Sequence, residues 1–319
     1  MQSFLASGIS GITLKITNMK KKFSIGIDLG GTKVEAIVLD NKNNILMRER
    51  VFTEGEKGPD HVINQIFSLY TKSLKSIKNN SHTIGIGTPG SISKSSNLLK
   101  NSNILSLNGL PFKKLIEEKI QNNIIIENDA NCFALAEALM GAGKGYSCVF
   151  GVIMGTGVGG GIVINKKIWQ GPQNIAGEWG HTVIDPQGPR CFCGAKGCIG
   201  CFISGAGLEK KIYIETGKKI SAQNFFKLKV INSQFKEIKQ DFFERYGQAL
   251  ANLINILDPN IVILGGGLSN INNLYTKGTQ EVYKRIFTDT PSTPIVKNKL
   301  GDSAGVIGAA FLGKEETTQ

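Results

Sequence analysis

Glycine-rich turns that join pairs of apolar strands are the feature that most restricts how this chain can fold. One turn joins strands predicted at 23–28 and 34–40, and another joins strands predicted at 148–154 and 161–165. The 39 glycines follow no Gly-x-y period, which excludes a collagen-like chain. Glycines between apolar runs allow the backbone to approach something small and charged. The sequence therefore predicts two similar sites of close backbone approach.

Strands and helices alternate in both halves of the chain. This order predicts a three-layer α/β fold in two lobes without an obvious linker, and 319 residues suffice for two domains. The further predicted elements are strands at 45–52, 83–90, 124–127 and 261–264, and helices at about 60–77, 112–121, 129–140 and 241–257, with a final helix in 301–312.

Composition narrows the class of protein. Hydrophobic residues make up 41% of the chain, which excludes a wholly disordered protein. The net charge is +12, but the lysines are spread evenly and no window is dense in arginine. A solvated surface is therefore favoured over a nucleic-acid stripe, and the positive charge would attract phosphorylated ligands.

Two segments bear on membranes and export. The uncharged segment 146–164 is long enough for a membrane span, but six glycines and many β-branched residues favour two buried strands. The N-terminus lacks the basic start of a secretory signal. We expect residues 1–22 to lie outside the fold, with Met19 as the native start. The expected location is the cytoplasm, with neither a membrane nor a nucleic acid as partner.

Three glycine turns are candidate phosphate sites, because backbone N–H groups there can reach phosphate oxygens. The second turn contains a formal G-x-G-x-x-G, but a strand follows it, which excludes a dinucleotide-binding motif. In the first turn Asp28 suits Mg²⁺ held through water, although an ordinary hairpin is the alternative. The turns are Asp28-Leu29-Gly30-Gly31-Thr32-Lys33, Gly155-Thr156-Gly157-Val158-Gly159-Gly160-Gly161 and Gly265-Gly266-Gly267.

One histidine and three cysteines form the pattern H-x9-C-x-C-x4-C, namely His181, Cys191, Cys193 and Cys198. One imidazole and three thiolates make a closed ligand set, which predicts a structural zinc site. Thiols packed as small hydrophobic groups are the alternative, and the intervening glycines favour a knuckle. The remaining thiols are assigned to packing at Cys132 and Cys148, and to a core residue or reactive bystander at Cys201.

Asp129 stands where a predicted strand ends and a helix begins. Aspartate suits the N-cap position, and the helix dipole predicts an ionised carboxylate with a low pKa. Glu137, on the same helix, is assigned to the surface or to the helix end.

Together these segments resemble the ROK family of repressors, open reading frames and sugar kinases, from about Lys22 to Leu312. The shared motifs are GIDLGGTK, ENDANCFALAEA, GTGVGGGIVIN, GEWGH and CFCGAKGC, and PGSIS, LNGLPF and NILDPNIVILGGGLSN are most similar to bacterial fructokinases. The resemblance implies a two-lobed actin-like, hexokinase-like ATPase fold with ribonuclease H-like lobes and a zinc-binding loop. It implies a small lobe at 23–127 plus 303–319, and a large lobe at 128–302 with the zinc knuckle at 181–198.

The resemblance also implies ATP-dependent phosphorylation of a hexose, D-fructose first, with N-acetylglucosamine, mannose or glucose as alternatives. Asp129 would be the base, and a homodimer would be the assembly. Implied sugar contacts are Gly90, Ser91, Asn103, Asn128, Asp129, Glu178 and His181. Implied contacts to Mg²⁺–ATP are Asp28, Gly30, Gly31, Thr32, Lys33, Gly155, Thr156, Gly157, Gly265, Gly266 and Gly267.

One departure from the family pattern concerns the sugar. The family continues Gly-Cys-Ile/Leu-Glu, whereas this chain has Gly200 in place of the glutamate, which predicts altered affinity and sugar choice. A DNA-binding repressor of the same family would need a winged helix-turn-helix before Phe23, and 22 residues are too few for three helices. A non-catalytic sugar sensor is the third alternative, and Gly200 is its only support.

Overall fold

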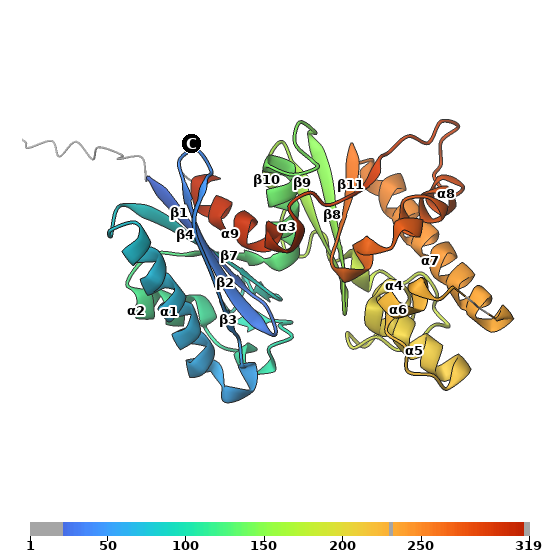
Figure 1. Ribbon diagram of the computed structural model, residues 1–319, viewed down its shortest axis with the longest axis horizontal. Helices are drawn as coiled ribbons and strands as arrows, with labels where there is room; N and C mark the ends of the chain where they lie inside the picture. The colour runs from blue at the N-terminus through green and yellow to red at the C-terminus, as the bar shows by residue number, and fades with distance from the viewer. Residues whose placement is uncertain (1–21, 230–231, 316–319) are drawn as a thin grey trace, which may run out of the picture.

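The computed structural model describes residues 22–229 and 232–315, which form two α/β lobes (Figure 1). Met19 and residues 1–18 lie outside the described residues. Each lobe contains a five-stranded sheet that opens with one of the predicted strand pairs. The three-layer α/β prediction is confirmed for both lobes.

The first sheet has the order β3-β2-β1-β4-β7. Its first three strands are antiparallel, whereas β4 and β7 run parallel to β1. A small hairpin, β5 (Ser91–Ile92) with β6 (Leu99–Lys100), stands apart from the sheet. The strands are β1 (Phe23–Leu29), β2 (Lys33–Asp40), β3 (Ile45–Phe52), β4 (His82–Thr88) and β7 (Ile125–Asn128).

The second sheet repeats this plan in the order β10-β9-β8-β11-β12, again with three antiparallel and then two parallel strands. The apolar segment 146–164 is therefore a strand pair, as predicted. In the described part of the chain, no helix has both the length and the apolar character of a membrane span. The strands are β8 (Cys148–Met154), β9 (Val158–Ile164), β10 (Lys167–Ile168), β11 (Ile261–Gly265) and β12 (Ile295–Lys297).

Helices cover the outer face of each sheet. On the first lobe, α1 (Pro59–Ser76) and α2 (Phe112–Ile120) bury their apolar faces against the strands. On the second lobe, α7 begins at Ser233 rather than 241, because the Asn232 side chain caps it by accepting the Phe235 N–H at 2.8 Å. The second-lobe helices are α4 (Gly200–Ile203), α5 (Gly205–Thr216), α6 (Ala222–Lys227), α7 (Ser233–Leu257) and α8 (Lys277–Tyr283). Short 3-10 segments are Gly55–Lys57, Leu105–Leu107, Trp179–His181, Gly267–Asn270, Asn272–Leu274 and Gly301–Ser303.

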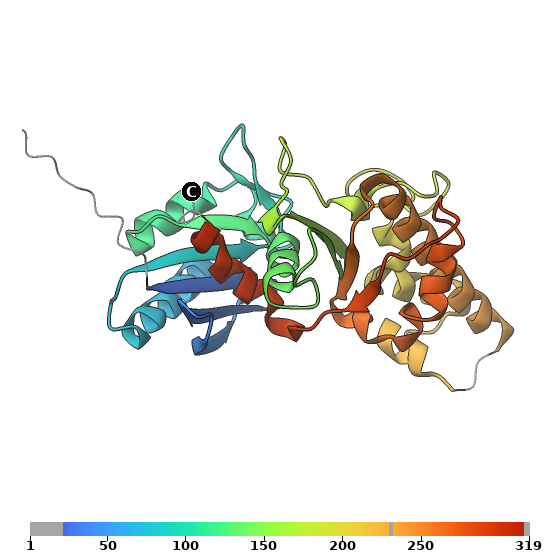
Figure 2. The ribbon, with the colours of Figure 1, turned by 90° about the horizontal axis from the view of Figure 1, so that it is seen from above.

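Two helices, α3 (Asp129–Leu139) and α9 (Ala304–Glu315), pack against each other between the sheets (Figures 1 and 2). The C-terminal α9 covers β1 and β4 of the first sheet, as predicted, whereas α3 covers β8 and β9 of the second. Glycines permit both contacts: a Cβ at Gly85 would lie 1.9 Å from the Ala309 carbonyl oxygen, and one at Gly161 would lie 2.6 Å from that of Ala130. The crossing helices therefore hold the two sheets together.

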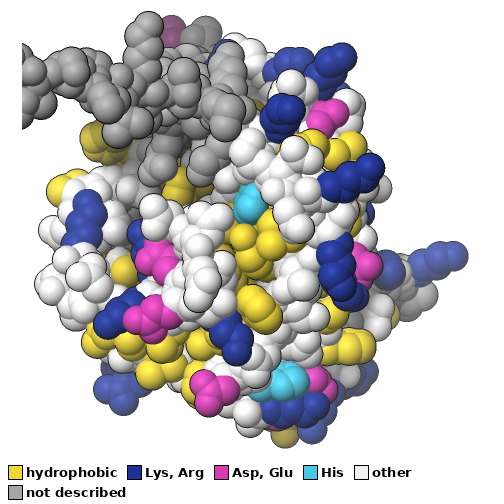
Figure 3. All heavy atoms as spheres, turned by 90° about the vertical axis from the view of Figure 1, so that its left-hand side faces the viewer, with side chains coloured by type: hydrophobic (Ala, Val, Ile, Leu, Met, Phe, Trp, Pro, Cys, Tyr) yellow, Lys and Arg dark blue, Asp and Glu magenta, His cyan; other side chains and the backbone are white. Residues whose placement is uncertain are grey.

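The outer face of the first lobe shows how the positive charge is distributed. Lys and Arg side chains there are interspersed with Asp and Glu, and those of the described residues form no continuous basic stripe on this face (Figure 3).

Candidate active site between the lobes

The predicted catalytic and nucleotide-binding residues lie where parallel strands end. In the first sheet Asp28 is in register with Gly87, and Thr88 with Asn128, so β1, β4 and β7 end along one edge. A cavity of about 500 Å³ lies between this edge and the second lobe. Among the residues that line it are Asp28, Lys33 and Asp129 beside the first sheet, and Gly266, Gly267 and Lys297 beside the second.

Two carboxyl groups in this cavity have raised pKa values. Burial, followed by the negative charge of Asp129, raises the pKa of Asp28 to about 7. Burial likewise raises the pKa of Asp129 to about 6, although the Ala130 N–H donates to it at 2.8 Å. The prediction of a low pKa for Asp129 was wrong, because loss of water outweighs the effect of the helix N-terminus. Two desolvated carboxyl groups suit a divalent cation with oxygen ligands.

The turn before α3 leaves Asp129 free to face the cavity. Asn128, not Asp129, is the N-cap, because its side-chain oxygen accepts the Ala130 N–H at 2.9 Å. Its side-chain nitrogen donates to the Gly90 carbonyl at 3.1 Å. Gly90 has φ +81°, and a Cβ there would lie 2.2 Å from the Lys100 carbonyl oxygen, so this position requires glycine. The structure thus brings Gly90, Ser91 and Asn128 together beside Asp129.

The first glycine turn is divided between the cavity and solvent. Asp28 and Lys33 line the cavity, whereas Gly31 and Thr32 are exposed and Gly30 is half-buried. The exposed Asn103 approaches this turn, because a Cβ at Gly31 would lie 3.5 Å from both polar atoms of the Asn103 side chain. Asn103 therefore lies on the same side of the molecule as the first turn.

The second and third turns form a smaller cavity of about 360 Å³, lined by residues that include Gly155, Thr156, Gly267, Glu209 and Gln223. Gly157 lines a separate cavity of about 770 Å³, described below. Gly266, at φ +76°, would place a Cβ 2.4 Å from the Met154 carbonyl oxygen. Gly265 differs from its neighbours: a Cβ there would lie 2.5 Å from the Phe133 ring, so its role is core packing against α3.

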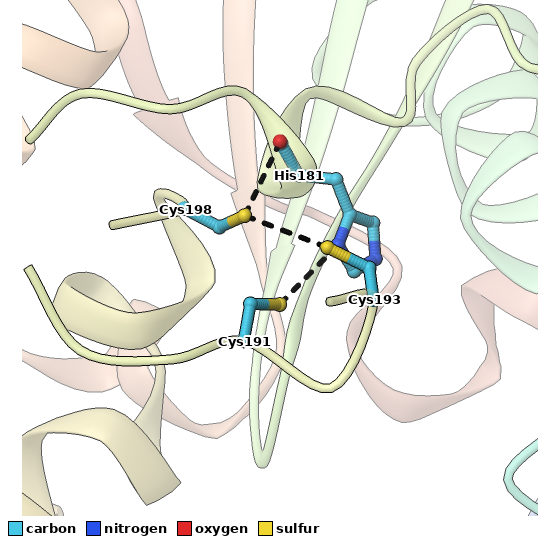
Figure 4. A group of neighbouring side chains, drawn as sticks. All are labelled: His181, Cys191, Cys193 and Cys198. Atoms are coloured by element: carbon cyan, nitrogen blue, oxygen red, sulfur yellow. Dashed lines mark hydrogen bonds between the residues drawn. The ribbon is translucent and has the colours of Figure 1, made fainter. Parts of the chain in front are cut away.

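The predicted metal ligands converge at one point (Figure 4). The Nδ1 atom of His181 and the three Sγ atoms all lie within 4.8 Å of one another. Cys193 and Cys198 have Sγ atoms 3.7 Å apart, and the Cys191 Sγ lies 3.6 Å from His181 Nδ1. Tetrahedral zinc with Zn–S bonds of about 2.3 Å requires ligand separations of about 3.7 Å. The residues therefore fit zinc, and ligation through Nδ1 would leave His181 Nε2 as a donor.

The predicted sugar residues of the second lobe lie near this cluster. A cavity of about 770 Å³ is lined by residues that include Asn103, Gly157, His181 and Gly200. The charge of Glu178 contributes to the raised pKa of Asp129, so these two carboxyl groups are neighbours. The half-buried Cys201 also lines this cavity, which excludes a purely core position for it.

Three polar side chains were not predicted as parts of the site. Glu137 was assigned to the surface or helix end, but it is fully buried and accepts the N–H groups of Ala142, Lys299 and Leu300 at 2.8–3.1 Å. The surface alternative was wrong, whereas the helix-end alternative holds, because Glu137 lies in the last turn of α3 and accepts the Ala142 N–H just beyond it. Glu127 and Gln170 are hydrogen-bonded to each other next to Asp129. The lone glutamate within the apolar run FALAEAL was the only signal for Glu137.

Comparison with known proteins places the chain in a family. The model of the ROK family matches residues 24–316. The N-acetyl-D-glucosamine kinase of Photobacterium profundum is 35% identical over 298 residues, covering 90% of this chain and 98% of that protein. A crystal structure of the ROK hexokinase from Thermus thermophilus has a TM-score of 0.83 at 29% identity, covering 92% of this chain and 98% of that one.

A ROK family glucokinase from Streptomyces griseus, solved with glucose and AMPPNP, has a TM-score of 0.73 at 26% identity and covers 92% of this chain and 99% of that one. The curated relative is an N-acetyl-D-glucosamine kinase, so the comparison does not support the finer resemblance to fructokinases. The chain therefore belongs to the ROK family, and its fold is the two-lobed α/β fold of that family's sugar kinases.

Proposed function

We propose that this protein transfers the γ-phosphoryl group of ATP to a hydroxyl group of a hexose, with Asp129 as the base. The observation that carries the proposal is the cavity between the lobes, in which Asp129, Asp28 and Lys33 meet the glycine turn of the second lobe. Support comes from the sugar kinases among the relatives and from the glucokinase that holds glucose and AMPPNP.

N-acetyl-D-glucosamine is the first candidate sugar, because curated relatives at 35% identity over almost their whole length are named for it. D-fructose, expected from the sequence motifs, ranks second, and mannose and glucose follow. Gly200 favours a preference that differs from that of relatives carrying glutamate there.

Each half of the site has its own role in the proposed reaction. Backbone groups at Gly155, Thr156, Gly266 and Gly267 would hold the nucleotide, and Lys33 would pair with its phosphates. Asp28 would hold Mg²⁺ through water, and that ion would neutralise phosphate charge when bound. The half-buried Gly30 and the exposed Gly31 and Thr32 would contact phosphate from the rim of the site.

Asp129 would accept the proton of the attacking hydroxyl group. The hydroxyl oxygen bonds to the γ-phosphorus, the bond from that phosphorus to the bridging oxygen breaks, and ADP leaves. A pKa of about 6 leaves Asp129 mostly ionised at neutral pH yet basic enough to take the proton. Asn103, Asn128, Glu178 and His181, with the backbone at Gly90 and Ser91, would hold the other sugar hydroxyls.

Zinc would influence the binding of the sugar rather than the binding of the phosphates. His181 is both a ligand of the cluster and a neighbour of the sugar cavity, so the metal would fix the orientation of its ring. The homodimer, the lobe boundaries and the cytoplasmic location remain proposals beside this one.

The test is ADP release by the purified protein with Mg²⁺–ATP and each of four sugars: N-acetyl-D-glucosamine, D-fructose, D-mannose and D-glucose. We expect sugar-dependent ADP release, largest with N-acetyl-D-glucosamine, and a sugar phosphate detectable by mass spectrometry. Binding of a sugar without any sugar-dependent ADP release would contradict the kinase proposal and favour the non-catalytic sensor.

A further inference from the structure

The buried carboxyl group of Glu127 lies beside the proposed base and is only 8% exposed. One oxygen, Oε1, accepts the Asn128 N–H at 2.7 Å and the Asn131 side-chain amide at 2.9 Å. The other oxygen, Oε2, accepts from the side-chain amide of Gln170. No Lys, Arg or His among the described residues forms an ion pair with this carboxylate. Glu127 therefore depends on amide donors for its stability in the fold.

Gln170 reaches Glu127 from the other lobe. It follows β10, which pairs with β9 in the second sheet, and the Trp169 N–H donates to the Ile162 carbonyl at 2.8 Å. Glu127 is the next-to-last residue of β7, the edge strand of the first sheet. The Gln170–Glu127 bond is therefore a contact between the two sheets that lies at the turn bearing Asp129.

A second contact holds the same segment to the first lobe. The Lys94 ammonium group, in the loop of the β5–β6 hairpin, donates to the Pro172 carbonyl at 3.0 Å and the Gly171 carbonyl at 3.4 Å. Beyond these residues, Gly177 has φ +91°, and a Cβ there would lie 2.4 Å from the Gly160 carbonyl oxygen. The segment 170–177 is thus fixed at both ends, and Glu178 follows it directly.

We propose that Gln170 is a positioning residue, whose bond to Glu127 fixes the segment leading to Glu178 relative to the turn that carries Asn128 and Asp129. The proposal rests on the proposed function, since it assigns Asp129 and Glu178 to one reaction. Without the Gln170 amide, Oε2 of Glu127 is left buried and unpaired, and the carboxylate must turn toward other donors. Such a rotation of the carboxylate moves the Asn128 N–H, which is bonded to the same group, and so changes the orientation of the Asp129 side chain.

Gln170→Ala tests this in a protein that should fold, because Gln170 is exposed. We expect kcat for the preferred sugar to fall about tenfold, with the KM for ATP within about twofold of wild type and a melting temperature lowered by only a few degrees. Gln170→Glu places a second carboxylate against Glu127 and should lower kcat further. Gln173→Ala is the matched control, because Gln173 is exposed in the same segment and its side chain makes no recorded hydrogen bond within the described structure.

Hydrogen–deuterium exchange without ligand provides a readout that does not need activity. Peptides covering 124–133 and 168–178 should exchange faster in Gln170→Ala and as in wild type in Gln173→Ala. A wild-type protein inactive on every sugar would refute the proposed function, and the exchange data would then decide the positioning role alone. Unchanged exchange, or wild-type kcat in an active Gln170→Ala protein, would overturn the positioning role.

Discussion

The two lobes share one sheet plan but differ in what stands at the strand ends. The first sheet presents charged residues to the cavity: Asp28 near the end of β1, Lys33 at the start of β2 and Asp129 directly after β7. In the second sheet β8 and β11 are followed by or end at the uncharged Gly155, Thr156 and Gly266, while β12 ends at Lys297. The two sheets end toward the same cavity, and the side chains placed there put the carboxyl groups of Asp28 and Asp129 beside the first sheet and a turn that would bind mainly through its main chain beside the second.

Asp129→Asn should lower kcat more than any other variant considered, and far more than a change in the glycine turn beside the second sheet. Loss of the proton acceptor is expected to lower kcat by about 10²–10⁴-fold, while ATP binding and the fold remain intact. Thr156→Ala removes only one neutral hydroxyl from the second lobe and should cost less than about tenfold. Steady-state kinetics and nucleotide titration of both variants measure this difference, and wild-type kcat in Asp129→Asn would exclude Asp129 as the base.

Gly85→Ala and Gly161→Ala test whether the crossing helices are equally close to both sheets. Each new Cβ meets a backbone oxygen, at 1.9 Å from α9 and 2.6 Å from α3. Overpacking of this kind costs typically about 1–3 kcal/mol, with the larger loss expected for Gly85→Ala. Urea unfolding measures both, and Gly157→Ala is the control, since a Cβ at that position has no neighbour within 4 Å in the part of the chain that the structure describes. Equal stability of all three variants would show that the helices can move away.

The Cys/His cluster lies in the second lobe, and the described residues of the first lobe contain no such group. The purified chain should contain about one zinc per subunit, and Cys193→Ser should lose it. Because the cluster includes His181, sugar affinity should fall about 10–100-fold while ATP affinity changes little. Elemental analysis and calorimetric titration measure both quantities, and metal-free protein with full sugar affinity would contradict the link.

The repeated strand pairs and the Cys/His cluster could be predicted because each leaves a local signal. Apolar runs on either side of a glycine turn predict a strand pair, and the spacing of the histidine and the cysteines predicts a set of metal ligands. The raised pKa of Asp129, the burial of Glu137 and the Glu127–Gln170 bond could not be predicted in this way. All three depend on segments far apart in the chain, such as 299–300 meeting Glu137, and no local pattern records that contact.

Asp28→Asn should change how the stability of the fold depends on pH. The pKa of Asp28 is raised from an ordinary 3.8 to about 7, so folding favours the protonated form. The stability from this group is complete below about pH 3.8 and is lost progressively as the pH rises from there to about 7. Asparagine has no such loss, so the variant should be more stable than wild type at pH 8.5, by about 1–3 kcal/mol, and little different at pH 4. Urea unfolding without Mg²⁺ at both pH values checks this, and a gain of the same size at both would contradict it.

The smallest expected effect concerns Gly200, the position where the family pattern has glutamate. Gly200 lines the same cavity as Asn103 and His181. Its φ lies outside the left-handed region, and among the described residues a Cβ there would meet only the Gly180 carbonyl oxygen within 4 Å, at 3.4 Å. A side chain can therefore be added without backbone strain, so a change in kinetics would report on the sugar rather than on folding.

Gly200→Glu should lower the KM for the preferred sugar about tenfold and leave the KM for ATP unchanged. A charge-assisted hydrogen bond to a sugar hydroxyl contributes on the order of 1.5–3 kcal/mol, and water already filling the space offsets part of that gain. Gly200→Gln is the matched control, because it adds the same length without the charge and should gain less. Kinetics are read beside the melting temperature of each variant. A stable Gly200→Glu protein with unchanged sugar KM would show that this side of the cavity does not face the sugar.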